Sequence, residues 1–101
     1  MAVNHIVCFK FNESVSPSDI ARHMEMFAGL SKTIPGIVSY SAGRSFGVAY
    51  ETTADYDSVH CLMCESEQAL ENYFHHEAHQ AFIAQNKHIW HSVFVINAQV
   101  D

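Results

Sequence analysis

Two kinds of hydrophobic periodicity follow one another along this chain of 101 residues, and their order leaves few folds open to it. A period of two is typical of strands, and a period of 3.6 is typical of helices. In chain order the segments are a strand at 5–11, a helix from 16 to 34, strands at 37–43 and 58–64, a helical region from 66 to 87 and a strand at 91–100. This order predicts one α+β domain over residues 1–101, of ferredoxin-like βαββαβ type, with two helical segments on one face of a four-stranded antiparallel sheet.

Local signals mark the ends of both helical regions. Ser16 is a good N-cap, and Asp19, three residues later, completes a capping box. The Pro-Gly pair at 35–36 is expected to end that helix. Ser66 is expected to cap the second helical region, which two histidines at 75–76 interrupt.

One face of the predicted sheet has no helix to cover it. The residues that alternation assigns to this face are Ile6, Cys8 and Lys10 from the first strand and Val59, Cys61 and Met63 from the third. This is more apolar surface than a monomer usually leaves in water. Charged residues make up only 16% of the chain, against about 25% in typical soluble domains. We therefore expect a homodimer in which two sheets face each other and enclose a barrel-like interior.

The charge pattern argues against nucleic acid as a partner. The formal net charge is -6. The basic residues are scattered along the chain: Lys10, Arg22, Lys32, Arg44 and Lys87. A nucleic-acid interface needs a clustered positive patch, which this pattern does not supply.

The sequence also favours a cytoplasmic protein without a membrane segment. The N-terminus lacks the pattern of a signal peptide, and no apolar run approaches the ~20 residues of a membrane helix. The three cysteines are an odd number and lie in strand-like segments. Such cysteines suit reduced thiols in a reducing compartment better than a disulfide framework.

Four stretches of the chain carry a resemblance to a known family: HIVCFKF at 5–11, IPGIVSYSAGR at 34–44, CESEQALENYFHHEAHQAF at 64–82 and HSVFVINAQV at 91–100. Through them the chain resembles the stress-responsive dimeric α/β-barrel family over nearly its whole length. The most specific block is S-x-x-x-L-x-x-Y followed by a His-rich break and A-H-Q-A-F. The sequence departs from the family at 76–77, where His-Glu replaces the usual His-Pro, and in the long connection expected over 44–57.

The resemblance implies a kind of chemistry as well as a dimeric fold. The family includes plant stress proteins, a hydroxynitrile lyase and olivetolic acid cyclase, a polyketide cyclase that works without a cofactor. In the cyclase, a pocket between sheet and helices holds a histidine that acts as a base and a tyrosine that orients the substrate. The matching positions here are His79 and Tyr73, and His5 matches a pocket histidine on the first strand. We therefore expect no cofactor.

Other pocket positions match the cyclase less closely, so the resemblance implies a different substrate. Phe27 stands where the cyclase has a tyrosine, His23 where it has a phenylalanine, and Ser58 where it has a histidine. His60 shares a strand face with Ser58 and is expected to face the same space. The expected substrate-binding residues are His5, Val7, His23, Met24, Phe27, Ser58 and His60.

His79 can be interpreted in two ways from its spacing. It lies on the same helical stripe as Phe82 and Ile83, which turns it inward. A neutral imidazole can remove a proton next to a carbonyl group, and the phenol of Tyr73 can hydrogen-bond the developing enolate oxygen. The alternative is a core histidine bonded to backbone carbonyls, with Tyr73 filling space. Both interpretations stay open at this point.

No pattern predicts a metal or redox site. The histidines within 75–79 have spacings that could bring two ligands to one metal, but the HEAH run among them is one residue short of the metalloprotease motif H-E-x-x-H. Cys61 and Cys64 have CxxC spacing, yet residues three apart on a strand point to opposite faces. We expect no metal.

These observations lead to three hypotheses of different kinds. The first is a homodimer whose pocket binds a small, largely apolar carbonyl compound and acts as a cofactor-free cyclase or lyase. The second is a non-catalytic stress-response or ligand-binding barrel. The third is a cofactor-free monooxygenase similar to the antibiotic-biosynthesis type, which shares the ferredoxin-like dimer. The chain has no nicotinamide or flavin fingerprint such as G-x-G-x-x-G, so a redox role would have to lack those cofactors.

Overall fold

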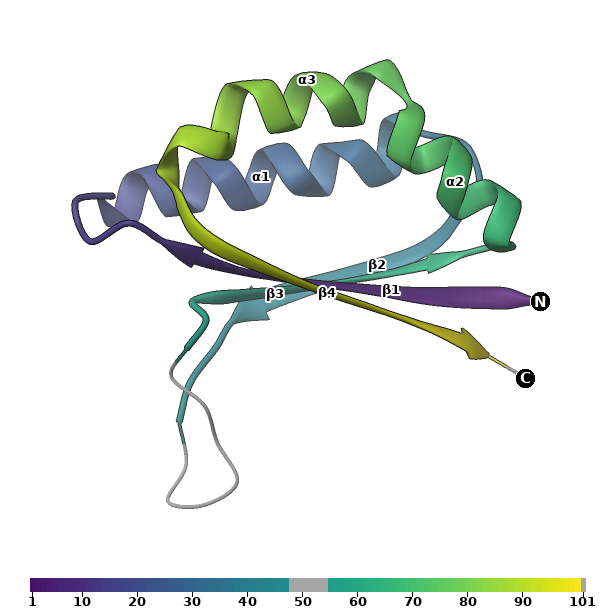
Figure 1. Cartoon of the computed structure of the whole chain (residues 1–101), viewed down its shortest axis with the longest axis horizontal. Coiled ribbons are helices and arrows are strands. Elements are labelled where there is room, and N and C mark those ends of the chain that lie inside the picture. The colour runs from purple at the N-terminus through teal and green to yellow at the C-terminus, as the bar shows by residue number, and fades with distance from the viewer. Residues whose placement is uncertain (48–54, 101) are drawn as a thin grey trace.

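A computed structural model describes residues 1–47 and 55–100 of the chain. The elements are β1 (Ala2–Phe11), α1 (Pro17–Thr33), β2 (Ile37–Arg44), β3 (Ser58–Cys64), α2 (Glu67–His75), α3 (Glu77–Asn86), a short 3-10 helix (Lys87–Ile89) and β4 (Trp90–Val100) (Figure 1). The ferredoxin-like α+β fold predicted from the sequence is confirmed. The second helical region is two helices separated at the histidine pair, and part of the predicted connection 44–57 lies outside the described residues.

The four strands form one antiparallel sheet in the order β2-β3-β1-β4. β1 lies between β3 and β4, so that Val7 has His60 opposite on one side and Val95 opposite on the other. All the helices lie on one face of this sheet (Figure 1). Alternate residues of β1 are buried beneath them: Val3, His5, Val7, Phe9 and Phe11.

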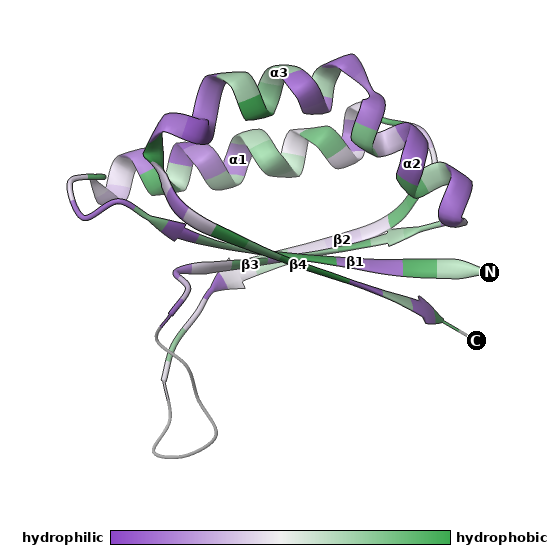
Figure 2. Ribbon diagram, viewed as in Figure 1, coloured by the Kyte–Doolittle hydropathy of each residue, from purple (hydrophilic) through white to green (hydrophobic). Residues whose placement is uncertain are grey.

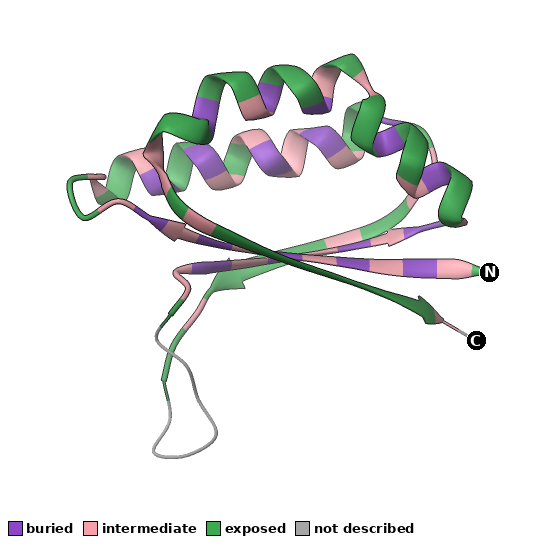
Figure 3. Ribbon diagram, viewed as in Figure 1, coloured by how far each residue is buried: buried purple, intermediate pink, exposed green. Residues whose placement is uncertain are grey.

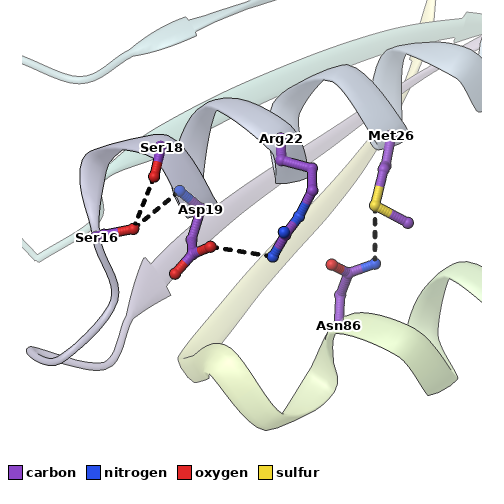
Figure 4. Close-up of polar contacts among 6 residues, drawn as sticks. All are labelled: Ser16, Ser18, Asp19, Arg22, Met26 and Asn86. Atoms are coloured by element: carbon purple, nitrogen blue, oxygen red, sulfur yellow. Dashed lines mark hydrogen bonds and ion pairs between the residues drawn. The ribbon is translucent and has the colours of Figure 1, made fainter.

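The start of α1 follows the predicted cap only in part. Ser16 Oγ accepts a hydrogen bond from the backbone N–H of Asp19 at 3.1 Å (Figure 4). The carboxylate of Asp19 does not complete the capping box. It accepts from Arg22 Nη2 at 3.0 Å instead, because an aspartate is one methylene shorter than the glutamate of a usual box and the arginine lies one turn further on.

The end of α1 depends on a glycine. Gly36 has φ of +90°, a left-handed conformation that other residues adopt only with strain. A Cβ atom at this position would also lie 2.9 Å from Cβ of Ala69 on α2. Gly36 therefore allows both the turn into β2 and the close approach of α2.

The core lies between the sheet and the helices, where Figure 3 shows the buried residues. Phe9, which is 2% exposed, is at its centre, with ring centroids of Phe27 at 5.8 Å and Trp90 at 5.0 Å. The buried stripe of α1 includes His23 at 0% exposure, while Met24 beside it is only half-buried. Within the described residues, no helix is long and apolar enough to cross a membrane.

The opposite face of the sheet carries no helix (Figure 1). The register puts on this bare face Ile6, Cys8, Val59, Cys61, Met63, Phe94 and Ile96. Phe94 and Ile96 are 47% and 50% exposed. β4 is accordingly hydrophobic in Figure 2 and exposed in Figure 3 along much of its length. The apolar bare face predicted from the strand patterns is present in this chain and is larger than predicted, because β4 extends it.

Candidate functional site

A cavity of about 610 Å³ lies between α2 and α3 on one side and β1 and β4 on the other. Most of its wall is apolar or aromatic: Val7, Phe9, Phe27, Leu70, Phe74, Phe82, Ile83, Trp90, Val93 and Val95. Its polar residues are His5, Glu67, Glu71, Tyr73, His75, His79 and Asn97. A concave apolar site with a few convergent polar groups has the composition of a small-molecule site.

The cavity exists because the helices do not cover β4. Val95 lies opposite Val7 and so belongs to the helix-facing side of the sheet, yet it is 47% exposed. Val93, two residues earlier on the same face, is 41% exposed. The inner face of β4 therefore forms an open wall instead of part of the packed core.

The break between α2 and α3 shapes the other wall. His76 has an extended conformation, with φ of -61° and ψ of 138°, and its Nδ1 accepts the backbone N–H of Ala78 at 3.0 Å. This cap starts α3 and leaves the Phe74 carbonyl available to other donors. That carbonyl accepts from His79 Nδ1 at 2.9 Å and from Gln80 Nε2 at 2.7 Å.

His79 is held in one tautomer by this contact. A carbonyl oxygen can only accept, so Nδ1 carries the proton and Nε2 keeps its lone pair. Within the described part of the chain, Nε2 has no hydrogen-bond partner. Burial lowers the pKa of His79, although the bond to Phe74 opposes this effect, and nearby His5 lowers the pKa further. The ring is therefore neutral near pH 7 and has a free acceptor nitrogen.

Tyr73 lies against His79, but the two side chains do not share a hydrogen bond. Their ring centroids are 4.5 Å apart. The Tyr73 hydroxyl is buried and has no partner among the described residues. Burial raises the pKa of Tyr73, and the nearby Cys64 and Tyr40 add to the rise. The ring of Tyr73 thus lines the cavity, while its hydroxyl is closed to solvent.

His5 completes the polar floor of the cavity. Its Nδ1 donates to Asn97 Oδ1 at 2.6 Å, and its ring meets the edge of Tyr73 with centroids 5.5 Å apart. Burial lowers the pKa of His5 and the bond to Asn97 partly opposes this. Val7 and Phe27, the other predicted pocket residues on these walls, line the same cavity.

The remaining predicted pocket residues do not line the cavity. His60 is fully buried, with Tyr40 Oη 2.7 Å from its Nδ1 and Ser58 Oγ 3.3 Å from its Nε2. His23 Nε2 accepts from Trp90 Nε1 at 2.8 Å. The prediction that His23, Met24, Ser58 and His60 face the ligand space does not match this arrangement, because aromatic rings, above all Phe9 and Phe27, fill the space between the two groups.

The lining residues with polar or hydrogen-bonding groups that the sequence did not predict as site residues are Trp90 and Asn97 from β4 and Glu67, Glu71 and His75 from α2. The β4 pair could not be assigned before the strand register was known. The α2 residues did carry a signal, since they are spaced four apart on one helical face.

No metal centre is found in the part of the chain that the structure describes, where no three His, Cys, Asp or Glu side chains are arranged to hold an ion. Cys61 and Cys64 lie on opposite faces of β3, the former on the bare face and the latter fully buried.

The fold and the cavity together define a class: a ferredoxin-like α+β domain with a bare sheet face and a small-molecule cavity beneath its helices. Within that class, the chain belongs to the stress-responsive A/B barrel domain family, whose model matches residues 3–100. No curated protein matches the chain.

Several solved structures share the fold. A protein of Arabidopsis thaliana, At3g17210, is 23% identical with a TM-score of 0.87, over 98% of this chain and 95% of that one. A dimeric ferredoxin-like protein of unknown function from Thermobifida fusca is 22% identical with a TM-score of 0.84, over 99% and 92%. A hydroxynitrile lyase from Passiflora edulis is 19% identical with a TM-score of 0.88, over 99% and 94%. At these identities the likeness establishes the fold alone.

Proposed function

We propose that this protein is a homodimer whose cavity binds a small, largely apolar carbonyl compound and performs proton transfer on it without a cofactor, as a lyase or cyclase. The observation that carries the proposal is the state of His79. Its Nδ1 is tied to the Phe74 carbonyl, its Nε2 is free, and it lines an apolar cavity that is open to solvent.

His79 would act as a general base. The lowered pKa keeps the imidazole neutral, so that Nε2 can accept a proton from a carbon next to a carbonyl group or from the hydroxyl of a cyanohydrin. In the second case the C–C bond breaks as the aldehyde forms, and cyanide leaves with the electron pair. The imidazolium then returns its proton to the leaving group.

Tyr73 would act as the hydrogen-bond donor. Its hydroxyl is a buried donor without a partner, and buried polar groups strongly favour a partner. A carbonyl oxygen that reached the floor of the cavity would satisfy it. The tyrosine has to move for this contact to form, since its hydroxyl is closed to solvent.

Cyanohydrin cleavage is the reaction to test first, because a hydroxynitrile lyase shares the fold. With mandelonitrile as substrate, benzaldehyde formation should fall at least tenfold in His79→Asn, whose amide can still donate to Phe74 but offers no basic nitrogen. The control is His91→Asn, because His91 is exposed and does not line the cavity. Equal loss in both variants would contradict a role for His79.

A ligand-binding barrel without catalysis is the second candidate. It is favoured by the absence of a hydrogen bond between Tyr73 and His79, so that no preformed acid–base pair exists in the described structure. In that case His79→Asn would lower the melting temperature or ligand affinity without removing any turnover. Oxygen consumption with a quinol would instead indicate the third candidate, a cofactor-free monooxygenase.

The homodimer is proposed to form through the bare face of the sheet. No helix of the described chain covers the apolar side chains of β1, β3 and β4 on this face (Figure 1), where Tyr56 contacts Phe94, and a similar structure is a dimeric protein. We also propose a cytoplasmic location, which is supported by three cysteines that form no disulfide with one another.

A further inference from the structure

The wall that α2 contributes to the cavity is negatively charged. Glu67, Glu71 and His75 are four residues apart, and all three line the cavity and are exposed. Between them Leu70 and Phe74 supply the apolar part of the same wall. A ligand in the cavity therefore lies beside two carboxylates as well as the aromatic wall.

No fixed positive charge balances these carboxylates. None of the lysines and arginines of the chain lines the cavity, and all five lie within the described residues. Lys10 is 3.6 Å from Asp57 and Arg22 is 3.0 Å from Asp19, so both are engaged elsewhere. Among the described lining residues, the other basic groups are the imidazoles of His5, His75 and His79, and burial lowers the pKa of His5 and of His79.

The positions of Glu67 and Glu71 are unfavourable for the helix itself. Two glutamates at i,i+4 repel each other, and a surface helix gains by placing a lysine at one of these positions. Glu67 is nevertheless held toward the cavity, because its carboxylate accepts a hydrogen bond from Gln99 Nε2 of β4. Gln99 is uncharged and leaves the negative charge in place.

Two polar side chains that line the same cavity, each with an atom that has no partner in the described chain, also indicate a ligand site. His79 is 9% exposed and its Nε2 has no partner within the described chain, and Tyr73 is 1% exposed with an unpartnered hydroxyl. Both line the cavity that the two glutamates border. The charge at the border therefore acts on whatever these groups bind.

We infer, on the basis of the proposed function, that Glu67 and Glu71 make the cavity select uncharged or amine-bearing carbonyl compounds and reject carboxylates and phosphate-bearing compounds. Two carboxylates beside a wall of low polarity focus their field on the cavity that they line. An anion that enters loses hydration and meets repulsion, while a neutral ketone is little affected and an ammonium group is attracted.

The test uses three probes with the same frame: 4-phenylbutan-2-one, 4-phenylbutylamine and 4-phenylbutanoate. Trp90 is the only tryptophan of the chain and lines the cavity, so its fluorescence reports occupancy directly, and calorimetry gives the dissociation constants. We expect the carboxylate to bind at least about tenfold more weakly than the ketone at low salt, with a smaller ratio at high salt.

The matched variants are Glu67→Gln with Glu71→Gln, and Glu13→Gln with Glu25→Gln as the control. Both pairs change the net charge equally, but Glu13 and Glu25 are exposed and do not line the cavity. The ratio of the dissociation constants of carboxylate and ketone should fall in the first pair, which keeps only the dehydration cost of the anion, and stay unchanged in the second.

The outcomes separate the inference from the proposed function. If the carboxylate binds the wild type as tightly as the ketone, or if both pairs of variants shift the ratio equally, the inference is wrong and the ligand cavity stands. If none of the three probes changes Trp90 fluorescence or releases heat, the cavity is not a site for such compounds, and both fail.

Discussion

His23 and His60 are the histidines most completely removed from water, each with 0% exposure. Burial lowers the pKa of His23 to about 4, and burial together with the nearby His23 lowers the pKa of His60 to about 4. His23 Nε2 accepts from Trp90, so the neutral ring carries its proton on Nδ1, which is buried without a partner in the described chain. Both rings are thus core groups that the fold holds neutral.

These two histidines predict a loss of stability in mild acid. The unfolded chain binds protons at its histidines below pH 6.5, while the folded chain resists them until about pH 4, so the free energy of unfolding falls as pH drops across this window. Lowering the pH from 7.5 to 5.0 should reduce the free energy of unfolding by about 2 kcal/mol for each of these two histidines. His5 and His79 act in the same direction. Urea unfolding at the two pH values measures the difference.

The variant His23→Phe tests how much of this pH dependence comes from His23. His23→Phe removes one of the two titrating rings, so the stability difference between pH 7.5 and 5.0 should shrink by about 2 kcal/mol, even if the variant is less stable at both. His91→Phe is the control, because His91 is exposed. Equal stability of the wild type at both pH values would contradict the prediction.

Individual site residues were only partly predictable from sequence. The spacing between His79 and Phe82 was enough to predict that His79 points inward, because helical periodicity is a local property. Asn97 could not be paired with His5, because that contact depends on the register between β1 and β4, which are far apart in the chain. His60 has the right strand parity for the pocket, but the ring of Phe27 lies 4.2 Å from its own and closes that space.

At the scale of elements, the four strands and the helical regions were visible in the sequence from their periodicity and, for the helices, their cap signals, whereas the first three residues of β1 and the 3-10 helix were not predicted. The break between α2 and α3 was visible as well, as two histidines inside a helical pattern. The effect of this break on His79 was not visible in the sequence. The Phe74 carbonyl can accept from His79 and fix its tautomer only because of the backbone conformation at the break.

The conformation of the break between α2 and α3 predicts that a proline in place of Glu77 stabilises the protein. Glu77 is the first residue of α3, where the helix itself supplies no partner for the backbone N–H, and His76 before it is extended. These are the conditions that proline favours at the start of a helix and in the residue before it. Glu77→Pro should therefore raise the free energy of unfolding by about 0.4–1 kcal/mol relative to Glu77→Ala, through the lower entropy of the unfolded chain.

Glu77→Ala is the needed reference because both variants lose the same carboxylate from the first turn of α3, where a negative charge is favourable. Thermal unfolding of the two variants gives the comparison. A lower melting temperature for the proline variant would show that the N–H of Glu77 has a partner or that the break adopts another conformation.

The whole molecule has two faces with separate roles. The helical side holds the cavity, and none of the bare-face residues lines it. The bare sheet face holds the apolar residues proposed to meet a second copy, with Ile6 between Cys61 and Ile96 on its neighbouring strands. Assembly and ligand binding can therefore be altered independently.

Ile6→Lys tests this separation. A lysine in the centre of the bare face should prevent two copies from burying it, because an unpaired charge in an apolar interface is costly. The wild type should sediment at micromolar concentration with twice the chain mass of 11.4 kDa, and Ile6→Lys with the chain mass. Ala84→Lys adds the same charge to exposed α3 and should remain dimeric. Because Ile6 does not line the cavity, the monomeric Ile6→Lys variant should still bind 4-phenylbutan-2-one. A wild type that sediments as a monomer would contradict the dimer. Loss of binding in Ile6→Lys alone would show that the cavity needs the partner.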